Sequence, residues 1–234
     1  MRTSLKVPFG FLAAVAVLLF PSGPLSAQDG PPKEDRAFRA PDLVELVTLD
    51  PTIRLDVRYA TKNNEFGRPF YSEARAFLQR PAAEALARVQ RALKAKGYGL
   101  LVFDGYRPWS VTKQFWDLTP ADKKVFVANP KNGSRHNRGG AVDLTLVDLA
   151  TGKEADMGGA YDEMTERSYV TYDKGPKEAL QRRDLLRGAM ETEGFFVYPF
   201  EWWHFDWKDF REYAVLDIPF GSLKQPAPAP ASVR

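Results

Sequence analysis

The chain contains only two histidines, and both lie in short motifs with carboxylates. His136 precedes Asp143 in the segment His-Asn-Arg-Gly-Gly-Ala-Val-Asp, and His204 ends the segment Glu-Trp-Trp-His that starts at Glu201. Two imidazoles and one carboxylate are the ligands of an open zinc site, which keeps a fourth position for a water that the metal acidifies. We therefore predict a metallohydrolase in which His136, Asp143 and His204 hold one Zn²⁺ per chain and Glu201 is the general base.

The first motif has a simpler alternative, in which His136 is a surface histidine and Asp143 a strand-end aspartate. The two glycines between them, Gly139 and Gly140, would let the loop approach closely, and the scarcity of histidine favours the metal site. Zinc suits this ligand set best, although cobalt, nickel or manganese could occupy it. Asp206 is either a hydrogen-bond partner of a ligand imidazole or an exposed carboxylate.

The second motif lies in an aromatic segment that we expect to be a turn or the start of a strand. Ordinary core packing is the simpler interpretation of its aromatic residues, and we expect it for at least two of them. These residues are Trp202, Trp203, Phe205 and Trp207. A buried aromatic wall would also lower the local dielectric and raise the pKa of Glu201 toward that of a useful base.

Length and charge predict one globular domain without a nucleic-acid partner. The chain has 234 residues, 44% of them hydrophobic, which is enough for a single well-buried domain, expected over residues 41–223. Residues 28–40 resemble a flexible lead-in, and the proline-spaced residues 224–234 a disordered tail. Without Arg2 and Lys6 the chain carries 31 basic and 30 acidic residues, a balance that argues against nucleic-acid binding.

Residues 1–27 are typical of a secretory signal peptide. A charged start is followed by an apolar run from Phe9 to Phe20 and a small-residue exit at Ala27. We expect an exported, periplasmic or secreted protein that is not inserted in the membrane after cleavage. An uncleaved anchor is the alternative, but the run is shorter than the roughly 20 residues that span a bilayer.

Hydrophobic periodicity predicts a mixture of helices and strands. Helices are expected over 81–96 and 176–193, and strands over 100–103, 141–146 and 195–198. In the second strand, Asp143 should face away from the apolar side chains because it alternates with them. No regular strand–helix–strand rhythm is present, so we predict a single α+β domain with a mainly antiparallel central sheet flanked by helices.

Three motifs together resemble the VanX-type D-alanyl-D-alanine dipeptidases of peptidase family M15. They are Asp104-Gly-Tyr-Arg-Pro108, Ser134-Arg-His-Asn-Arg-Gly-Gly-Ala-Val-Asp-Leu-Thr-Leu146 and Glu201-Trp-Trp-His204. Weaker similarity in residues 55–61, 157–168 and 181–187 extends the resemblance over residues 43–218. The resemblance implies a Hedgehog/DD-peptidase-like fold, with zinc on His136, Asp143 and His204 and Glu201 as the base.

The resemblance also implies roles for three further residues. Arg107 would stabilise the oxyanion, because a fixed guanidinium beside a developing alkoxide stabilises charge that appears only in the transition state. The alternative is an Arg-Pro turn packed on Tyr106. Asp162 would bind the free amino end of a dipeptide, or else be solvated.

Ser134 would help to hold the other end of the substrate, or else form a turn beside Gly133. Tyr59 and Tyr71 could line the pocket, and we assign neither of them a role.

The activity implied by the resemblance is zinc-dependent hydrolysis of the small dipeptide D-Ala-D-Ala. Well-known relatives act in the cytoplasm, so an exported enzyme would instead recycle dipeptides released from peptidoglycan. A D,D-carboxypeptidase or endopeptidase acting on wall stem peptides is the first alternative, and activity on a blocked N-terminus distinguishes it. A non-catalytic zinc-binding module is the second, disfavoured because both Glu201 and Arg107 are present. The oligomeric state stays open.

Overall fold

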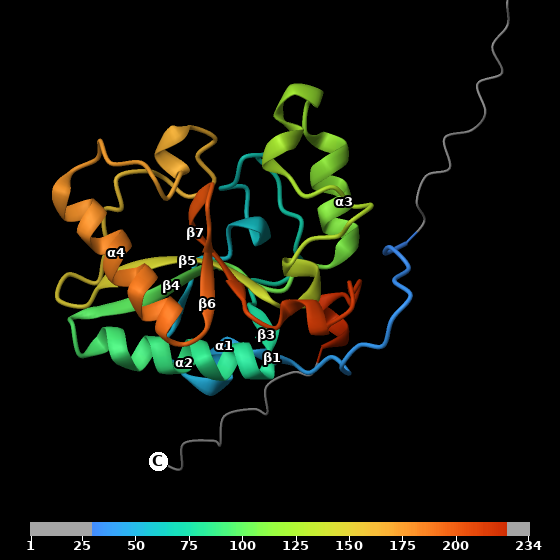
Figure 1. Cartoon of the computed structure of the whole chain (residues 1–234), viewed down its shortest axis with the longest axis horizontal. Helices are drawn as coiled ribbons and strands as arrows, with labels where there is room; N and C mark the ends of the chain where they lie inside the picture. The colour runs from blue at the N-terminus through green and yellow to red at the C-terminus, as the bar shows by residue number, and fades with distance from the viewer. Residues whose placement is uncertain (1–29, 224–234) are drawn as a thin grey trace, which may run out of the picture.

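A five-stranded sheet in the order β2-β4-β5-β7-β6 forms the centre of the computed structural model, which describes residues 30–223 (Figure 1). β2 runs parallel to β4, and the other neighbouring strands are antiparallel. The strands are β2 (Arg54–Leu55), β4 (Tyr98–Asp104), β5 (Ala141–Asp148), β6 (Phe195–Tyr198) and β7 (Glu201–Trp207). The prediction of an α+β domain with a mainly antiparallel sheet is confirmed.

Two long helices, α2 (Arg80–Lys94) and α4 (Lys177–Thr192), pack against the sheet and against each other (Figure 1). α2 has Pro81 in its first turn, where the missing N–H is not needed, and it buries an apolar face of alanine, leucine and valine. α4 contacts β6 and α2 contacts β4, so the two helices hold the edge strand and a central strand in place.

Smaller elements complete the domain. β1 (Leu43–Glu45) and β3 (Phe77–Gln79) form a two-stranded antiparallel sheet, with the short helix α1 (Leu46–Leu49) beside it. Helix α3 (Trp109–Leu118) lies apart from α2 and α4 on another side of the molecule (Figure 1). Single turns of 3-10 helix occupy many of the connections.

β5 is buried along almost its whole length. Every residue from Ala141 to Val147 is buried, so both faces of the strand are covered and not only the predicted apolar face. The aromatic residues of β7 are also core residues, since Trp202, Trp203, Phe205 and Trp207 are each at most 4% exposed. β7 is thus firmly held beside β5, which fixes the side chains that the two strands share.

The predicted signal peptide and the predicted tail from residue 224 lie outside the described residues. The described part of the predicted lead-in, residues 30–40, has no helix or strand, although Glu34 pairs with Arg138 at 2.7 Å. Within residues 30–223 no helix is both long and apolar enough to cross a membrane.

Candidate metal centre and active site

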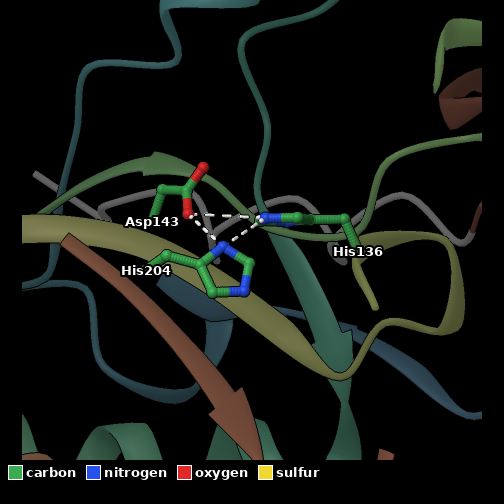
Figure 2. A group of neighbouring side chains, drawn as sticks. All are labelled: His136, Asp143 and His204. Carbon is green, nitrogen blue, oxygen red and sulfur yellow. Dashed lines mark hydrogen bonds and ion pairs between the residues drawn. The ribbon is translucent and has the colours of Figure 1, made fainter. Parts of the chain in front are cut away.

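His136, Asp143 and His204 meet in one buried cluster (Figure 2). His136 Nε2 lies 3.1 Å from His204 Nδ1, Asp143 Oδ1 lies 2.9 Å from His204 Nδ1, and Asp143 Oδ1 lies 3.4 Å from His136 Nε2. Each residue is at most 6% exposed. Residues that are far apart in the sequence therefore bring three possible metal donors together.

The register of the sheet creates this convergence. Asp143 on β5 is directly opposite His204 on β7, and directly opposite residues of antiparallel strands project from the same face. His136 comes from the 3-10 turn His136–Arg138 that leads into β5. The two glycines after this turn are needed there: Gly139 has φ +64°, and a Cβ on Gly140 would lie 2.4 Å from Cβ of Phe210.

Hydrogen bonds fix which nitrogen of each imidazole faces the cluster. His136 Nδ1 donates to the carbonyl of Gly105 at 2.7 Å, because a carbonyl can only accept. His204 Nε2 donates to Asp206 Oδ1 at 2.9 Å, and Arg135 pairs with the same carboxylate at 3.1 Å. These contacts direct the opposite nitrogens, Nε2 of His136 and Nδ1 of His204, into the cluster, where their lone pairs would be available to a bound metal.

The donor atoms fit a zinc ion. Zinc held 2.0–2.1 Å from each donor with tetrahedral angles separates its donors by roughly 3.3 Å, close to the three distances in the cluster. The charge also fits. Burial lowers the pKa of His204, but the hydrogen bonds to Asp143 and Asp206 outweigh burial and raise it from 6.5 to about 10 in the metal-free protein. The carboxylates thus favour a positive charge at this point, which a divalent cation would supply.

Glu201 stands beside the cluster at the start of β7. Its Oε2 lies 3.6 Å from His204 Nδ1, and the side chain is 26% exposed to solvent. Residues three apart on a regular strand face opposite ways, but the β6–β7 register shifts between Val197 and Tyr198, so Glu201 and His204 share one side. Burial raises the pKa of the Glu201 carboxyl, which makes it a stronger base than an exposed glutamate.

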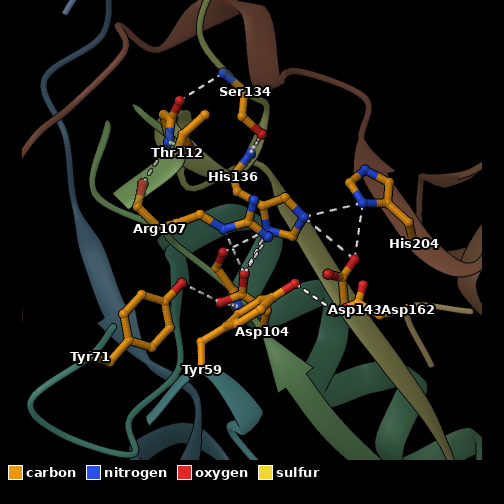
Figure 3. Close-up of polar contacts among 12 residues, drawn as sticks. Tyr59, Tyr71, Asp104, Arg107, Thr112, Ser134, His136, Asp143, Asp162 and His204 are labelled. Atoms are coloured by element: carbon orange, nitrogen blue, oxygen red, sulfur yellow. Dashed lines mark hydrogen bonds and ion pairs between the residues drawn. The ribbon is translucent and has the colours of Figure 1, made fainter. Parts of the chain in front are cut away.

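Arg107 is held in the same cavity by a buried network (Figure 3). Its Nε and Nη2 donate to Asp104 Oδ2 at 2.9 and 2.7 Å. The other oxygen of Asp104 accepts a hydrogen bond of 2.8 Å from Tyr71. The guanidinium also lies 4.8 Å from the centre of the Phe115 ring. Arg107 is therefore a fixed positive charge, as the proposed oxyanion role requires.

Asp162 and Ser134 line a cavity of about 470 Å³ that also contains the three cluster residues, Glu201 and Arg107. Asp162 accepts a 2.7 Å hydrogen bond from the hydroxyl of Tyr59 (Figure 3). Burial raises its pKa from 3.8 to about 7. Ser134 Oγ accepts a hydrogen bond from the backbone N–H of His136 at 3.3 Å, so this serine does shape the turn, and its own O–H remains a donor.

Three residues support the site, and two of them, Asp104 and Tyr161, had no role assigned from the sequence. Asp104 holds Arg107, Asp206 holds His204, and the hydroxyl of Tyr161 donates to Asp143 Oδ2 at 3.1 Å. Asp206 was left as one of two alternatives, and it is the hydrogen-bond partner. Each of the three lies within three residues of a predicted site residue, which is the one local signal that could have indicated them.

A buried cluster of two imidazoles and a carboxylate, with a separate carboxylate and a guanidinium in the same cavity, defines a metallohydrolase. A family model described as D-ala-D-ala dipeptidase, of peptidase family M15, matches residues 39–218. The chain belongs to this family.

Relatives named D-alanyl-D-alanine dipeptidase support the assignment. One from Escherichia coli K12 is 34% identical and covers 79% of this chain and 94% of its own length. Another, from Enterococcus faecalis V583, is 38% identical and covers 72% of this chain and 88% of its own. Among solved structures, the LdcB LD-carboxypeptidase is similar with a TM-score of 0.44 and 20% identity, over 74% of this chain and 72% of that chain.

Proposed function

We propose that this protein hydrolyses the free dipeptide D-Ala-D-Ala to two molecules of D-alanine, with one Zn²⁺ per chain. The observation that carries the proposal is the position of Asp162, whose carboxylate shares one cavity with the metal cluster, Glu201 and Arg107. A carboxylate at this place can pair with the ammonium of a free N-terminus, which a longer peptide would not have there. The names of the relatives agree with this substrate.

The side chains have distinct tasks in this reaction. Zinc bound by His136, Asp143 and His204 would supply a Lewis acid for the scissile carbonyl and lower the pKa of water. Glu201 accepts a proton from the attacking water and returns it to the leaving amine. Arg107 faces the negative charge that develops on the carbonyl oxygen, and its contact with Asp104 keeps it in place before the reaction.

The remaining two residues would hold the ends of the substrate. Asp162 pairs with the ammonium, and the O–H of Ser134 donates to the carboxylate at the other end. Together they would place the peptide bond between the metal and Arg107. Holding the substrate in this position would lower the entropic cost of reaching the transition state and so raise the rate.

Hydrolysis of free D-Ala-D-Ala beside its N-acetylated copy tests the proposal. We expect cleavage of the free dipeptide only, loss of cleavage after chelation, and recovery with zinc. Glu201→Gln should lower kcat by at least about 100-fold and leave zinc content near one per chain, because Glu201 moves protons and is not a ligand. Activity retained by this variant would refute the role of Glu201.

A D,D-carboxypeptidase that acts on wall stem peptides is the second candidate. The favouring observation is the cavity, whose 470 Å³ falls in the range of sites for ligands larger than a dipeptide. Cleavage of the N-acetylated substrate would support this activity and would contradict the ammonium-binding role of Asp162.

The predicted signal peptide supports an exported location and a role in recycling peptidoglycan dipeptides. Fractionation of cells that produce the full chain tests the location: a shortened protein in the periplasm or the medium is expected, whereas a full-length protein in the cytoplasm would contradict it.

A further inference from the structure

The two oxygens of Asp143 have different partners. Oδ1 faces the two imidazoles, at 2.9 Å from His204 Nδ1 and 3.4 Å from His136 Nε2. Oδ2 accepts the hydrogen bond of 3.1 Å from Tyr161. The phenol therefore holds the oxygen that does not face the cluster, and the carboxylate presents a single oxygen to the metal position.

The ring of Tyr161 cannot easily turn away from this contact. Tyr161 is 7% exposed, and its ring is stacked on Phe103, with centroids 4.4 Å apart and planes inclined by 23°. Trp203 of β7 packs against the same ring edge-to-face, at 5.6 Å between the centroids. The aromatic packing fixes the direction in which the hydroxyl points, and hence the orientation of the carboxylate that it holds.

Tyr161 and Asp162 lie in the loop between β5 and α4, and the backbone of this loop directs both side chains inward. Asp162 has φ +58°, in the left-handed region, so Tyr161 and Asp162 do not alternate as on a strand. Tyr161 contacts Asp143, and Asp162 contacts Tyr59. The start of the loop is also fixed, since Nε of the buried Arg183 donates to the carbonyl of Met157 at 2.6 Å.

We propose that Tyr161 is a positioning residue that keeps Asp143 a one-oxygen metal ligand. A carboxylate that turned to bind with both oxygens would take up a further coordination position, which a catalytic zinc site leaves open for water and substrate. Outer partners of this kind fix ligand orientation and raise metal affinity. The inference rests on the proposed metal site and adds to it the residue that controls its third ligand.

Tyr161→Phe tests the proposal, because phenylalanine keeps the stacked ring and removes only the hydroxyl. We expect the zinc Kd, measured by competition with a chelator, to rise roughly 10- to 100-fold. The visible spectrum of the cobalt-substituted protein should change as well, because the carboxylate can then rotate. Tyr213→Phe is the matched control: Tyr213 is also a buried tyrosine, at 4% exposure, and its contact with Arg138 is made by its backbone carbonyl, which the substitution keeps. Its zinc Kd and cobalt spectrum should equal those of the wild type.

A double-mutant cycle shows whether the effect acts through Asp143. In the Asp143→Ala background, Tyr161→Phe should change the zinc Kd by less than about twofold, because no carboxylate is left to position. An unchanged Kd and cobalt spectrum in the single variant, or an equally large effect in the Asp143→Ala background, would overturn the inference.

Two further checks show whether a changed zinc Kd comes from misfolding and whether a negative result concerns Tyr161 or the proposed metal site. The metal-free Tyr161→Phe variant should keep the far-ultraviolet circular dichroism of the wild type and a cooperative urea transition of unchanged slope, which shows that the fold persists and that the Kd comparison is valid. If the wild type itself binds no zinc, the proposed metal site fails. If the wild type binds zinc and Tyr161→Phe binds it equally well, only the role of Tyr161 fails.

Discussion

Replacing Asp162 with asparagine should stabilise the metal-free protein and at the same time weaken its activity. Asparagine adopts the left-handed backbone at φ +58° as readily as aspartate does. Its amide oxygen can accept the hydrogen bond that Tyr59 now donates at 2.7 Å. The substitution therefore preserves the shape of the loop and removes only the charge.

The expected gain follows from the pKa of Asp162. Burial raises this pKa from 3.8 to about 7, the hydrogen bond from Tyr59 acts against burial, and the negative charges of Asp143 and Glu201 raise it further. Between about pH 4 and pH 7 the folded state keeps a proton that the unfolded chain loses, so the free energy of unfolding falls as the pH rises through this window. The difference corresponds to at most about 4 kcal/mol, and water that reaches the half-buried side chain reduces it to about 1–2 kcal/mol at pH 8.

Urea unfolding of the metal-free wild type and Asp162→Asn at pH 4 and pH 8 measures this gain. The two proteins should be nearly equal at pH 4, and the variant should be more stable at pH 8. Other titrating groups are shared by both proteins and largely cancel in the comparison. A variant that is less stable at pH 8, or a difference that does not depend on pH, would refute the assignment of a buried, charged Asp162.

The catalytic part of the same prediction uses zinc-loaded protein. Loss of a charge-assisted contact to the substrate ammonium should lower kcat/KM for D-Ala-D-Ala by roughly 10- to 150-fold. Equal activity of the two proteins on the free dipeptide would show that the ammonium binds elsewhere.

Three further predictions concern the supporting structure. Asp206→Asn should raise the zinc Kd about 10-fold in a chelator competition, because a weaker acceptor then holds the ligand imidazole; an unchanged Kd would contradict this. Asp104→Asn should lower the free energy of unfolding by about 3 kcal/mol and reduce kcat, since it leaves Arg107 buried without its ion partner; unaltered urea unfolding would oppose the idea. Gly140→Ala should cost about 1–3 kcal/mol because its Cβ would meet Phe210, whereas Gly188→Ala in α4, which meets nothing within 4 Å, should gain up to about 1 kcal/mol; similar melting temperatures for both would count against the packing argument.

Strongly periodic segments could be predicted from the sequence. The helices expected over 81–96 and 176–193 correspond to α2 and α4, within one or two residues at each end. The strands expected over 100–103, 141–146 and 195–198 correspond to β4, β5 and β6. Such segments carry their own signal because a repeating apolar face specifies the element that can bury it.

Short elements could not be predicted in this way. β1 and β3 have three residues each. Elements of this length have too few residues to show a period, and packing against the rest of the domain supplies their stability. The 3-10 turn that carries His136 is of the same kind, so its position beside β5 could not be read from local preference.

The residue types of the chain are enough to indicate its chemistry. With only two histidines, each next to a suitable carboxylate, the available metal donors were few, and side-chain type sets what a residue can coordinate. The geometry of the site, in contrast, depends on the folded domain. The register that places Asp143 opposite His204 joins residues 61 positions apart, and the contact of Tyr161 with Asp143 joins residues 18 apart. The irregular β6–β7 pairing, which turns Glu201 toward the cluster, is a departure from regular strand geometry. Such contacts depend on how the whole core packs, and no local pattern specifies them.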